Sequence, residues 1–253
     1  MLDLFKLDNK VALVTGAGRG LGQAMAIALA EAGSDVAGLD VLSLDETSAC
    51  VQALGRRFLP ISANLLEAHA EDMTKVVDQV LAGLGSLDVL INNAGIIRRA
   101  PLLEFSEKDW DDVMQINLKS VFLLSQAAGR VMVERGNGKI INIASMLSFQ
   151  GGIRVPSYTA SKSGVAGLTR LMANELAASG LNINAIAPGY MATDNTAVLR
   201  ADAERASSIL DRIPSGRWGE PADLMGTVVF LASAASDYMN GAIVPVDGGW
   251  LTR

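Results

Sequence analysis

The stretch SYTASK, residues 157–162, carries a phenol and an amine four residues apart. The run around it is rich in small residues and has a helical pattern, and residues four apart on a helix share one face. A free tyrosine has a pKa of about 10 and is a poor base at neutral pH. A nearby ammonium favours the phenolate and lowers that pKa. The pair Tyr158 and Lys162 therefore predicts a general acid and base that needs no histidine.

Two further polar residues can serve the same site. Ser145 ends the apolar run 139–145, and ligands of open α/β sheets bind beyond the carboxyl ends of the strands. Its hydroxyl can hydrogen-bond the oxygen of a carbonyl or an alcohol. Asn117 lies inside a helical pattern, where an asparagine usually faces solvent or bonds locally. The alternative is that Asn117 holds a water molecule against Lys162.

A glycine-rich stretch, TGAGRGLG, follows the first apolar run and opens a helical pattern with Gly16, Gly20 and Gly22. Glycine lets the backbone approach a pyrophosphate closely, and a helix N-terminus supplies free N–H groups. The second apolar run ends at Asp40, which can bind the ribose 2′-hydroxyl of NAD and would repel the 2′-phosphate of NADP. Arg19 argues the other way, but the stretch VLSLDE after Asp40 has no basic residue. The sequence therefore favours NAD.

The rest of the chain must position these residues. Seven short apolar runs alternate with helical patterns such as 21–33 and 106–132. Continuous apolar runs suit strands that are buried on both faces of a parallel sheet. The alternation predicts one α/β domain over 1–253 with a doubly wound sheet and helices on both faces. A long polar segment at about 190–218 breaks the rhythm and is typical of a lid. The seven runs are 10–18, 34–40, 56–64, 87–95, 139–145, 181–188 and 242–249.

Composition excludes several classes of protein. The net charge is −6 with no basic run, which argues against nucleic acid as a partner. One cysteine, Cys50, allows no intrachain disulfide, and with one histidine, His69, the chain cannot build an ordinary zinc site. We expect Cys50 to be buried or half-buried and His69 to lie on a surface helix. The N-terminus shows no targeting signal and no apolar run is long enough to span a bilayer, so we expect a cytoplasmic protein without membrane or metal.

Together, TGAGRGLG, NNAG, Asn117, Ser145, YTASK and PGYMAT resemble the short-chain dehydrogenase/reductase family over essentially the whole chain. The resemblance implies a Rossmann fold with a seven-stranded parallel sheet, a nicotinamide cofactor and a homotetramer. It implies that Tyr158 is the general acid and base and that Ser145 orients the reacting oxygen. Lys162 would lower the tyrosine pKa and bind the nicotinamide ribose, and Asn117 would hold a relay water. The cofactor residues implied are Gly16, Arg19, Gly20, Leu21, Gly22, Asp40, Asn64, Leu65, Asn93, Ala94, Gly95, Tyr158, Lys162, Pro188, Gly189, Met191 and Thr193.

One of these residues departs from the family pattern. Many members have an aspartate near the end of the third strand, where it binds the adenine amino group, and this chain has Asn64 instead. An amide oxygen can accept the same hydrogen bond. Asn64 therefore stays in the expected cofactor site.

Within the family, the stretches at 104–114, 140–165 and 247–250 resemble bacterial sugar-acid dehydrogenases. The resemblance implies NAD-linked chemistry on a sugar acid during the breakdown of uronate polymers such as pectin. A carboxylate substrate calls for local positive charge, and the fork of an arginine binds both of its oxygens. Arg98, Arg99 and Arg154 are candidates by chain order, although each could be a solvated loop residue or a partner of lid acids. Arg154 ranks first, and the substrate residues expected are Arg98, Ser145, Gln150, Arg154, Tyr158 and Met191.

Other functions are compatible with the same scaffold. A gluconate 5-dehydrogenase differs only in its sugar acid. A 3-oxoacyl-carrier-protein reductase normally prefers NADP and docks an acidic carrier through a basic patch, and Asp40 argues against it. A dinucleotide-binding regulator without catalysis is a different class, and the intact Asn-Ser-Tyr-Lys set argues against that.

Overall fold

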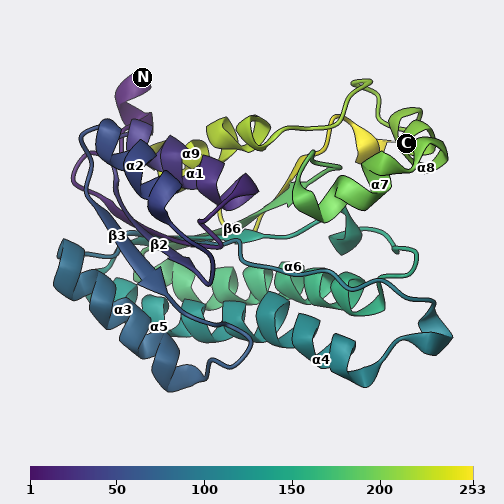
Figure 1. Ribbon diagram of the computed structural model, residues 1–253. Helices are drawn as coiled ribbons and strands as arrows, with labels where there is room; N and C mark the ends of the chain where they lie inside the picture. The colour runs from purple at the N-terminus through teal and green to yellow at the C-terminus, as the bar shows by residue number, and fades with distance from the viewer. Residues whose placement is uncertain (253) are drawn as a thin grey trace.

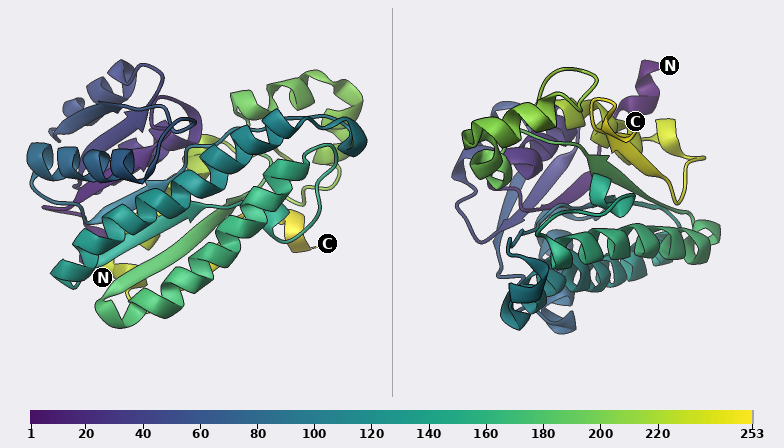
Figure 2. Two further views of the ribbon diagram at one scale, coloured as in Figure 1. Left: turned by 90° about the horizontal axis from the view of Figure 1, so that it is seen from below. Right: turned by 90° about the vertical axis from the view of Figure 1, so that its right-hand side faces the viewer.

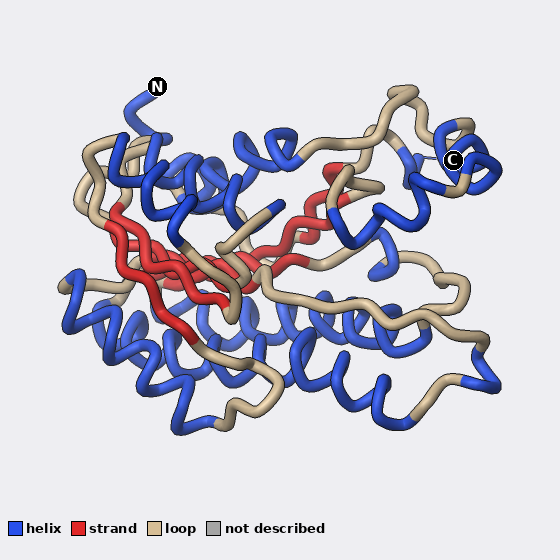
Figure 3. The backbone as a smooth tube through the Cα atoms, in the orientation of Figure 1, coloured by secondary structure: helices blue, strands red, loops and turns tan. Residues whose placement is uncertain are grey.

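A computed structural model describes residues 1–252 of the protein. The strands gather in a central sheet flanked by helices (Figure 3). The sheet has seven strands in the order β3-β2-β1-β4-β5-β6-β7, and every neighbouring pair is parallel. The predicted fold class and all seven predicted strands are therefore confirmed. The strands are β1 (Val11–Thr15), β2 (Asp35–Asp40), β3 (Phe58–Ser62), β4 (Val89–Asn92), β5 (Gly138–Ile143), β6 (Leu181–Pro188) and β7 (Ile243–Val246).

Helices cover both faces of this sheet (Figure 1). Side chains alternate along β1, so that Val11 and Leu13 pack in the core beside α3 and α5 while Ala12 and Val14 pack in the core beside α1 and α9. Burial on both faces explains why the strands read as continuous apolar runs. The helices are α1 (Gly20–Glu31), α2 (Asp45–Ala53), α3 (Ala70–Leu84), α4 (Glu107–Met114), α5 (Ser120–Arg135), α6 (Pro156–Leu176), α7 (Ala197–Ala201), α8 (Ala203–Leu210) and α9 (Met225–Ala232).

The strand order reverses beside β1, which has β2 on one side and β4 on the other. In an open parallel sheet, this reversal leaves a crevice beyond the carboxyl ends of the strands, where ligands bind. The glycine-rich loop follows β1, Asp40 ends β2, and the loops after β4 and β5 carry the arginines and Ser145. The topology therefore brings the candidate residues to one edge of the sheet.

The helical pattern predicted over 106–132 contains an interruption. Ser106 caps α4 by accepting a hydrogen bond from the backbone N–H of Asp109 at 3.1 Å. A π-helical turn over Gln115–Lys119 then separates α4 from α5, and Asn117 lies inside this turn. Such turns inside helices occur often at functional sites, since the extra residue redirects a side chain.

The segment 190–218 holds a short 3-10 turn, Asp194–Thr196, followed by α7 and α8. Its two ends meet, because the N–H of Ala192 donates to the carbonyl of Gly219 at 2.7 Å. Tyr190 packs against Trp250 at a ring-centroid distance of 4.7 Å, so the chain's last turn lies beside this segment (Figure 1). The base of the segment is thus fixed, while α7 and α8 project from the sheet.

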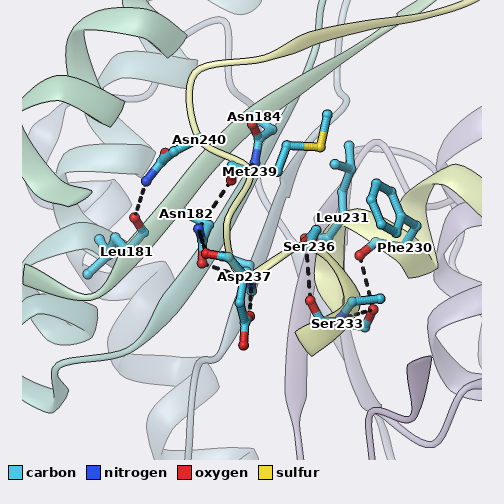
Figure 4. A network of polar contacts seen from close by, with 12 residues as sticks. Leu181, Asn182, Asn184, Phe230, Leu231, Ser233, Ser236, Asp237, Met239 and Asn240 are labelled. Atoms are coloured by element: carbon cyan, nitrogen blue, oxygen red, sulfur yellow. Dashed lines mark hydrogen bonds and ion pairs between the residues drawn. The ribbon is translucent and has the colours of Figure 1, made fainter. Parts of the chain in front are cut away.

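The opposite edge of the sheet is held by a polar network around the loop before β7 (Figure 4). The side-chain amides of Asn182 and Asn184 donate to the carbonyl of Met239 at 3.1 and 2.9 Å, and that of Asn240 donates to Leu181 at 2.7 Å. Lys139 pairs with Asp237 at 2.7 Å. These contacts lie away from the carboxyl ends of the strands, so we assign them a structural role.

Three smaller expectations concern single residues and membranes. Cys50 is half-buried, as predicted. His69 is exposed but precedes α3 as its N-terminal cap instead of lying within the helix, and its backbone N–H donates to Asp72 at 3.0 Å. No helix within residues 1–252 is long and apolar enough to cross a membrane.

Candidate active site

A cavity of about 360 Å³ opens beyond the carboxyl ends of β1, β2 and β4. Most of the residues predicted to bind a cofactor line it, which brings together positions from the glycine loop to the helix α6. Three predicted cofactor residues, Pro188, Gly189 and Met191, lie outside this lining. The predicted residues in the lining are Gly16, Arg19, Gly20, Leu21, Gly22, Asp40, Asn64, Leu65, Asn93, Ala94, Gly95, Tyr158, Lys162 and Thr193.

The glycine loop is clamped so that α1 points its N-terminus at the cavity. The side-chain amide of Asn93 donates to the carbonyls of Thr15 and Gly16 at 2.9 and 3.2 Å, which fastens the loop to the end of β4. A Cβ atom at Gly22 would lie 1.9 Å from the carbonyl oxygen of Gly16, so only glycine lets the helix approach this closely. The free N–H groups of the first turn suit a pyrophosphate.

Asp40 is fixed at the far side of the cavity. Its carboxylate accepts hydrogen bonds from the backbone N–H groups of Gly18, Val41 and Leu42 at 2.9, 2.7 and 3.0 Å. Asn64 also lines the cavity, and its amide oxygen accepts from the N–H of Leu66 at 3.1 Å. A rigid carboxylate beside a glycine-rich helix start fits the ribose end of a dinucleotide, and the residues present therefore suit that cofactor.

The chemistry-bearing residues meet at the other end. Pro156 begins α6, so that Tyr158 and Lys162 stand on its first two turns. The ammonium nitrogen of Lys162 lies 5.7 Å from the centre of the Tyr158 ring and donates to the carbonyl of Ile143 at 2.5 Å. Ser145 follows β5, and its hydroxyl, which accepts from the backbone N–H of Leu147 at 3.2 Å, acts to lower the pKa of the Tyr158 phenol. Lys162 is 4% exposed, and burial lowers its pKa to about 8.

The phenol shows the opposite of the shift that the four-residue spacing predicted. Burial raises the pKa of Tyr158 above its ordinary value, and the hydrogen bond from Ser145 and the charge of Arg99 offset this only in part. The amine of Lys162 is directed to the carbonyl of Ile143, and its own charge is destabilised by burial. Spacing along a helix indicates proximity, but it does not include the desolvation that dominates here.

Asn117 holds the loop after β4. Its side chain is fully buried, with its oxygen accepting from the N–H of Ile96 and its nitrogen donating to the carbonyl of Ile96, both at 2.9 Å. A longer contact of 3.4 Å reaches the hydroxyl of Ser161 on α6. These contacts give Asn117 a positioning function between the π-helical turn and the catalytic helix, and its predicted contact with a relay water stays a prediction.

The three candidate arginines separate in the structure. Arg98 pairs with Asp109 at 3.3 Å, and Arg154 is exposed in a left-handed backbone conformation with φ of 64°. Arg99 donates to the carbonyl of Asn195 at 2.9 Å, and its charge acts on the phenol of Tyr158. Partial burial lowers the pKa of the Arg99 guanidinium. Of the three, Arg99 is therefore the one whose charge acts on the phenol, and we take it as the leading candidate for the substrate carboxylate; the prediction that Arg154 binds it stays a prediction.

The remaining predicted residues lie around the site. Gln150 accepts a hydrogen bond from Arg212 at 3.2 Å, and the guanidinium of Arg212 lies 4.0 Å from the centre of the Trp250 ring. Met191 is 4% exposed and packs in the core against Gly219. Pro188 and Gly189 pair with the end of β7 and are not part of the cavity lining. The sequence had missed Asp194 and Asn195, which line the cavity from the first turn of the inserted segment.

A Rossmann-type sheet with this glycine loop, a fixed acid at the end of β2 and a Tyr-Lys-Ser group beside the cavity defines a dinucleotide-binding oxidoreductase. The sequence pattern of the short chain dehydrogenase family matches residues 10–204, and the chain belongs to this family. It is 61% identical to 2-dehydro-3-deoxy-D-gluconate 5-dehydrogenase of Escherichia coli K12 over 254 residues, which is 100% of both chains. It is 54% identical to the enzyme of the same name from Bacillus subtilis 168, over 99% of this chain and 98% of that one.

Solved structures are similarly close. The gluconate 5-dehydrogenase from Burkholderia cenocepacia J2315, in complex with NADP and tartrate, superposes with a TM-score of 0.94. The two chains are 39% identical, with 100% of this chain and 99% of that chain covered. The resemblance to sugar-acid dehydrogenases of this family, predicted from sequence segments, is therefore confirmed.

Proposed function

We propose that the protein is an NAD-dependent dehydrogenase of a sugar acid and interconverts an alcohol and a ketone of 2-dehydro-3-deoxy-D-gluconate at carbon 5. The observation that carries this proposal is the Tyr158 phenol at the end of a dinucleotide cavity, where Ser145 and the charge of Arg99 both act to lower its pKa. The names of relatives that match the whole chain at 61% and 54% identity supply the substrate.

The residues divide the chemistry between them. A bound nicotinamide supplies or accepts the hydride. For reduction, Tyr158 donates its phenolic proton to the ketone oxygen as the carbon receives the hydride; for oxidation, the phenolate takes the proton of the hydroxyl. Ser145 holds the reacting oxygen by a hydrogen bond, and Lys162 stands beside the phenol with a depressed pKa. Because burial raises the pKa of Tyr158, the phenol is protonated and ready to donate at neutral pH.

We propose NAD as the preferred cofactor on the strength of Asp40. Three backbone N–H groups fix its carboxylate, so it cannot turn away from a ligand without losing those bonds. A 2′-phosphate beside it would place like charges close together. A solved relative holds NADP, so the preference rests on this chain's own residues.

A homotetramer fits the outer face of α4, α5 and α6, where the two long helices α5 and α6 lie side by side (Figure 2). An apolar groove of about 940 Å³ runs along this face, and Phe122 and Leu171 are 43% and 50% exposed on it. A second copy of the chain would cover these side chains.

We further propose that 190–218 acts as a lid over the substrate and that the enzyme works in the cytoplasm, where a nicotinamide pool is maintained.

The function is tested by a panel of sugar acids, gluconate and acyl thioesters, each with NAD(H) and NADP(H). Replacing Arg99 with Met should raise the Michaelis constant for the sugar acid by roughly ten- to a hundredfold, as expected for about 1.5–3 kcal/mol from a hydrogen bond to a charged group. The constant for NAD should stay near that of the wild type. Arg99→Lys should recover part of the loss, since it keeps the charge without the fork.

Arg154→Met is the matched control, because it removes an exposed arginine from the neighbouring loop. If Arg99→Met binds the sugar acid as the wild type does, or if a neutral thioester is the better substrate, the sugar-acid assignment fails and the oxidoreductase assignment stands. If gluconate is turned over best, the protein is a gluconate 5-dehydrogenase.

A further inference from the structure

Two parts of the chain that lie 175 residues apart meet over the cavity. Arg19, in the glycine loop, forms an ion pair with Asp194, in the first turn of the inserted segment, and both line the cavity. The next residue, Asn195, accepts a hydrogen bond from Arg99 at 2.9 Å. The hydroxyl of Thr196 donates to the carbonyl of Met191 at 2.6 Å. The turn that carries Asp194 is therefore held in place from several sides.

The ion pair engages one of the positively charged side chains that line the cavity. Within residues 1–252, the charged side chains of the lining are Arg19, Asp40, Lys162 and Asp194. Lys162 is bound to the carbonyl of Ile143 at the catalytic end. Arg19 directly follows Gly18, and the backbone N–H of Gly18 donates to Asp40. Of these two cations in the lining, Arg19 is therefore the one beside the end of the cavity that suits the ribose. Asp194 engages that cation.

We propose that Asp194 is a cofactor-specificity residue that disfavours NADP by holding Arg19 away from the 2′-phosphate. The inference rests on the proposed use of a nicotinamide dinucleotide. A 2′-phosphate would meet the fixed carboxylate of Asp40, and the guanidinium that could neutralise it would first have to leave Asp194. NAD has no 2′-phosphate and places no such demand on Arg19. Discrimination thus has two parts, repulsion by Asp40 and sequestration of Arg19 by Asp194.

The test measures dinucleotide binding by isothermal titration calorimetry, without substrate. For Asp194→Asn, the dissociation constant of NADP should fall by about two- to fivefold, the scale of an exposed ion pair, while that of NAD changes by less than about twofold. Adding Arg19→Met to Asp194→Asn should remove the gain, because the freed guanidinium is then absent. Glu204→Gln is the matched control, since it removes one exposed acid from α8 of the same segment.

Three results would overturn the inference. They are an equal gain for NAD and NADP in Asp194→Asn, a gain that survives the loss of Arg19, or the same gain in Glu204→Gln. Because no substrate is present, an absence of sugar-acid turnover would leave a positive result intact. A wild type that binds neither dinucleotide would overturn the proposed function and this inference together.

Discussion

Burial of Lys162 should reduce the free energy of unfolding of this protein at neutral pH. The side chain is 4% exposed, and its pKa falls from 10.5 to about 8 because burial destabilises the ammonium. At about 1.4 kcal/mol for each pKa unit, the ammonium of the native state costs about 3 kcal/mol at pH 7 relative to the unfolded chain. Replacing Lys162 with Met, which is unbranched and apolar, removes this cost. We therefore expect an inactive variant that tolerates more urea at pH 7 than the wild type does.

The pH dependence isolates the charge from other effects of the substitution. Between pH 8 and 10.5 the unfolded chain holds the proton on Lys162 and the native state does not, so the stability of the wild type rises with pH. From pH 7 to 9.5 this gain is about 2 kcal/mol. Lys162→Met lacks the gain, while the carbonyl of Ile143 loses its donor equally at both pH values. The difference in unfolding free energy between the two proteins should therefore change by about 2 kcal/mol in favour of the wild type.

The assay is urea unfolding followed by circular dichroism at one fixed protomer concentration, since assembly makes apparent stability depend on concentration. Lys75→Met is the control, because this lysine lies on the exposed face of α3 with its side chain 67% exposed. A stability difference between the wild type and Lys162→Met that is the same at pH 7 and 9.5 would refute the reasoning, as it would show that Lys162 titrates alike in both states.

Three further predictions concern the phenol and the assembly. Tyr158→Phe should still bind the dinucleotide in calorimetry but lose about a hundred- to ten-thousandfold in turnover, and near-normal turnover at any pH would reject the phenol as the acid and base. The raised pKa of Tyr158 also predicts that alcohol oxidation in the wild type speeds up as the pH rises above neutrality. Replacing Phe122 and Leu171 with Asp should reduce the mass of the assembly in analytical ultracentrifugation, whereas Leu103→Asp, in an exposed 3-10 turn, should not. An unchanged mass in the double variant would show that this face is not an interface.

The residues that the sequence located well are those whose role is local. The glycine loop, Asp40 and Ser145 each stand at the end of an apolar run, and a parallel sheet brings such ends to one edge. Tyr158 and Lys162 share a helix face because of their spacing. For these positions, the strand pattern and the helical period were enough to predict the side of the molecule on which they lie.

The site residues that the sequence located poorly are those whose positions depend on contacts between distant segments. Asp194 was missed, because nothing near it in the sequence points to Arg19 as its partner. Arg154 was ranked above Arg99 from chain order, but both loops reach the same edge of the sheet, so chain order could not show which guanidinium acts on the phenol. Met191 follows β6 as predicted but turns into the core, where it contacts Gly219. Chain order predicts which residues lie near one another, whereas tertiary packing determines the direction in which each side chain points.

The pKa values of the catalytic pair show why this difference matters for chemistry. From spacing alone, Lys162 should lower the pKa of Tyr158, but burial lowers the pKa of the amine and raises that of the phenol. Both shifts have one cause, the transfer of two ionisable groups from water into the fold. Each shift favours the neutral form, so the site holds a protonated phenol beside an amine that loses its proton at a lower pH than an ordinary lysine. This arrangement suits the general acid that we propose for ketone reduction at neutral pH, and the proposed oxidation then depends on the pH at which the phenol gives up its proton.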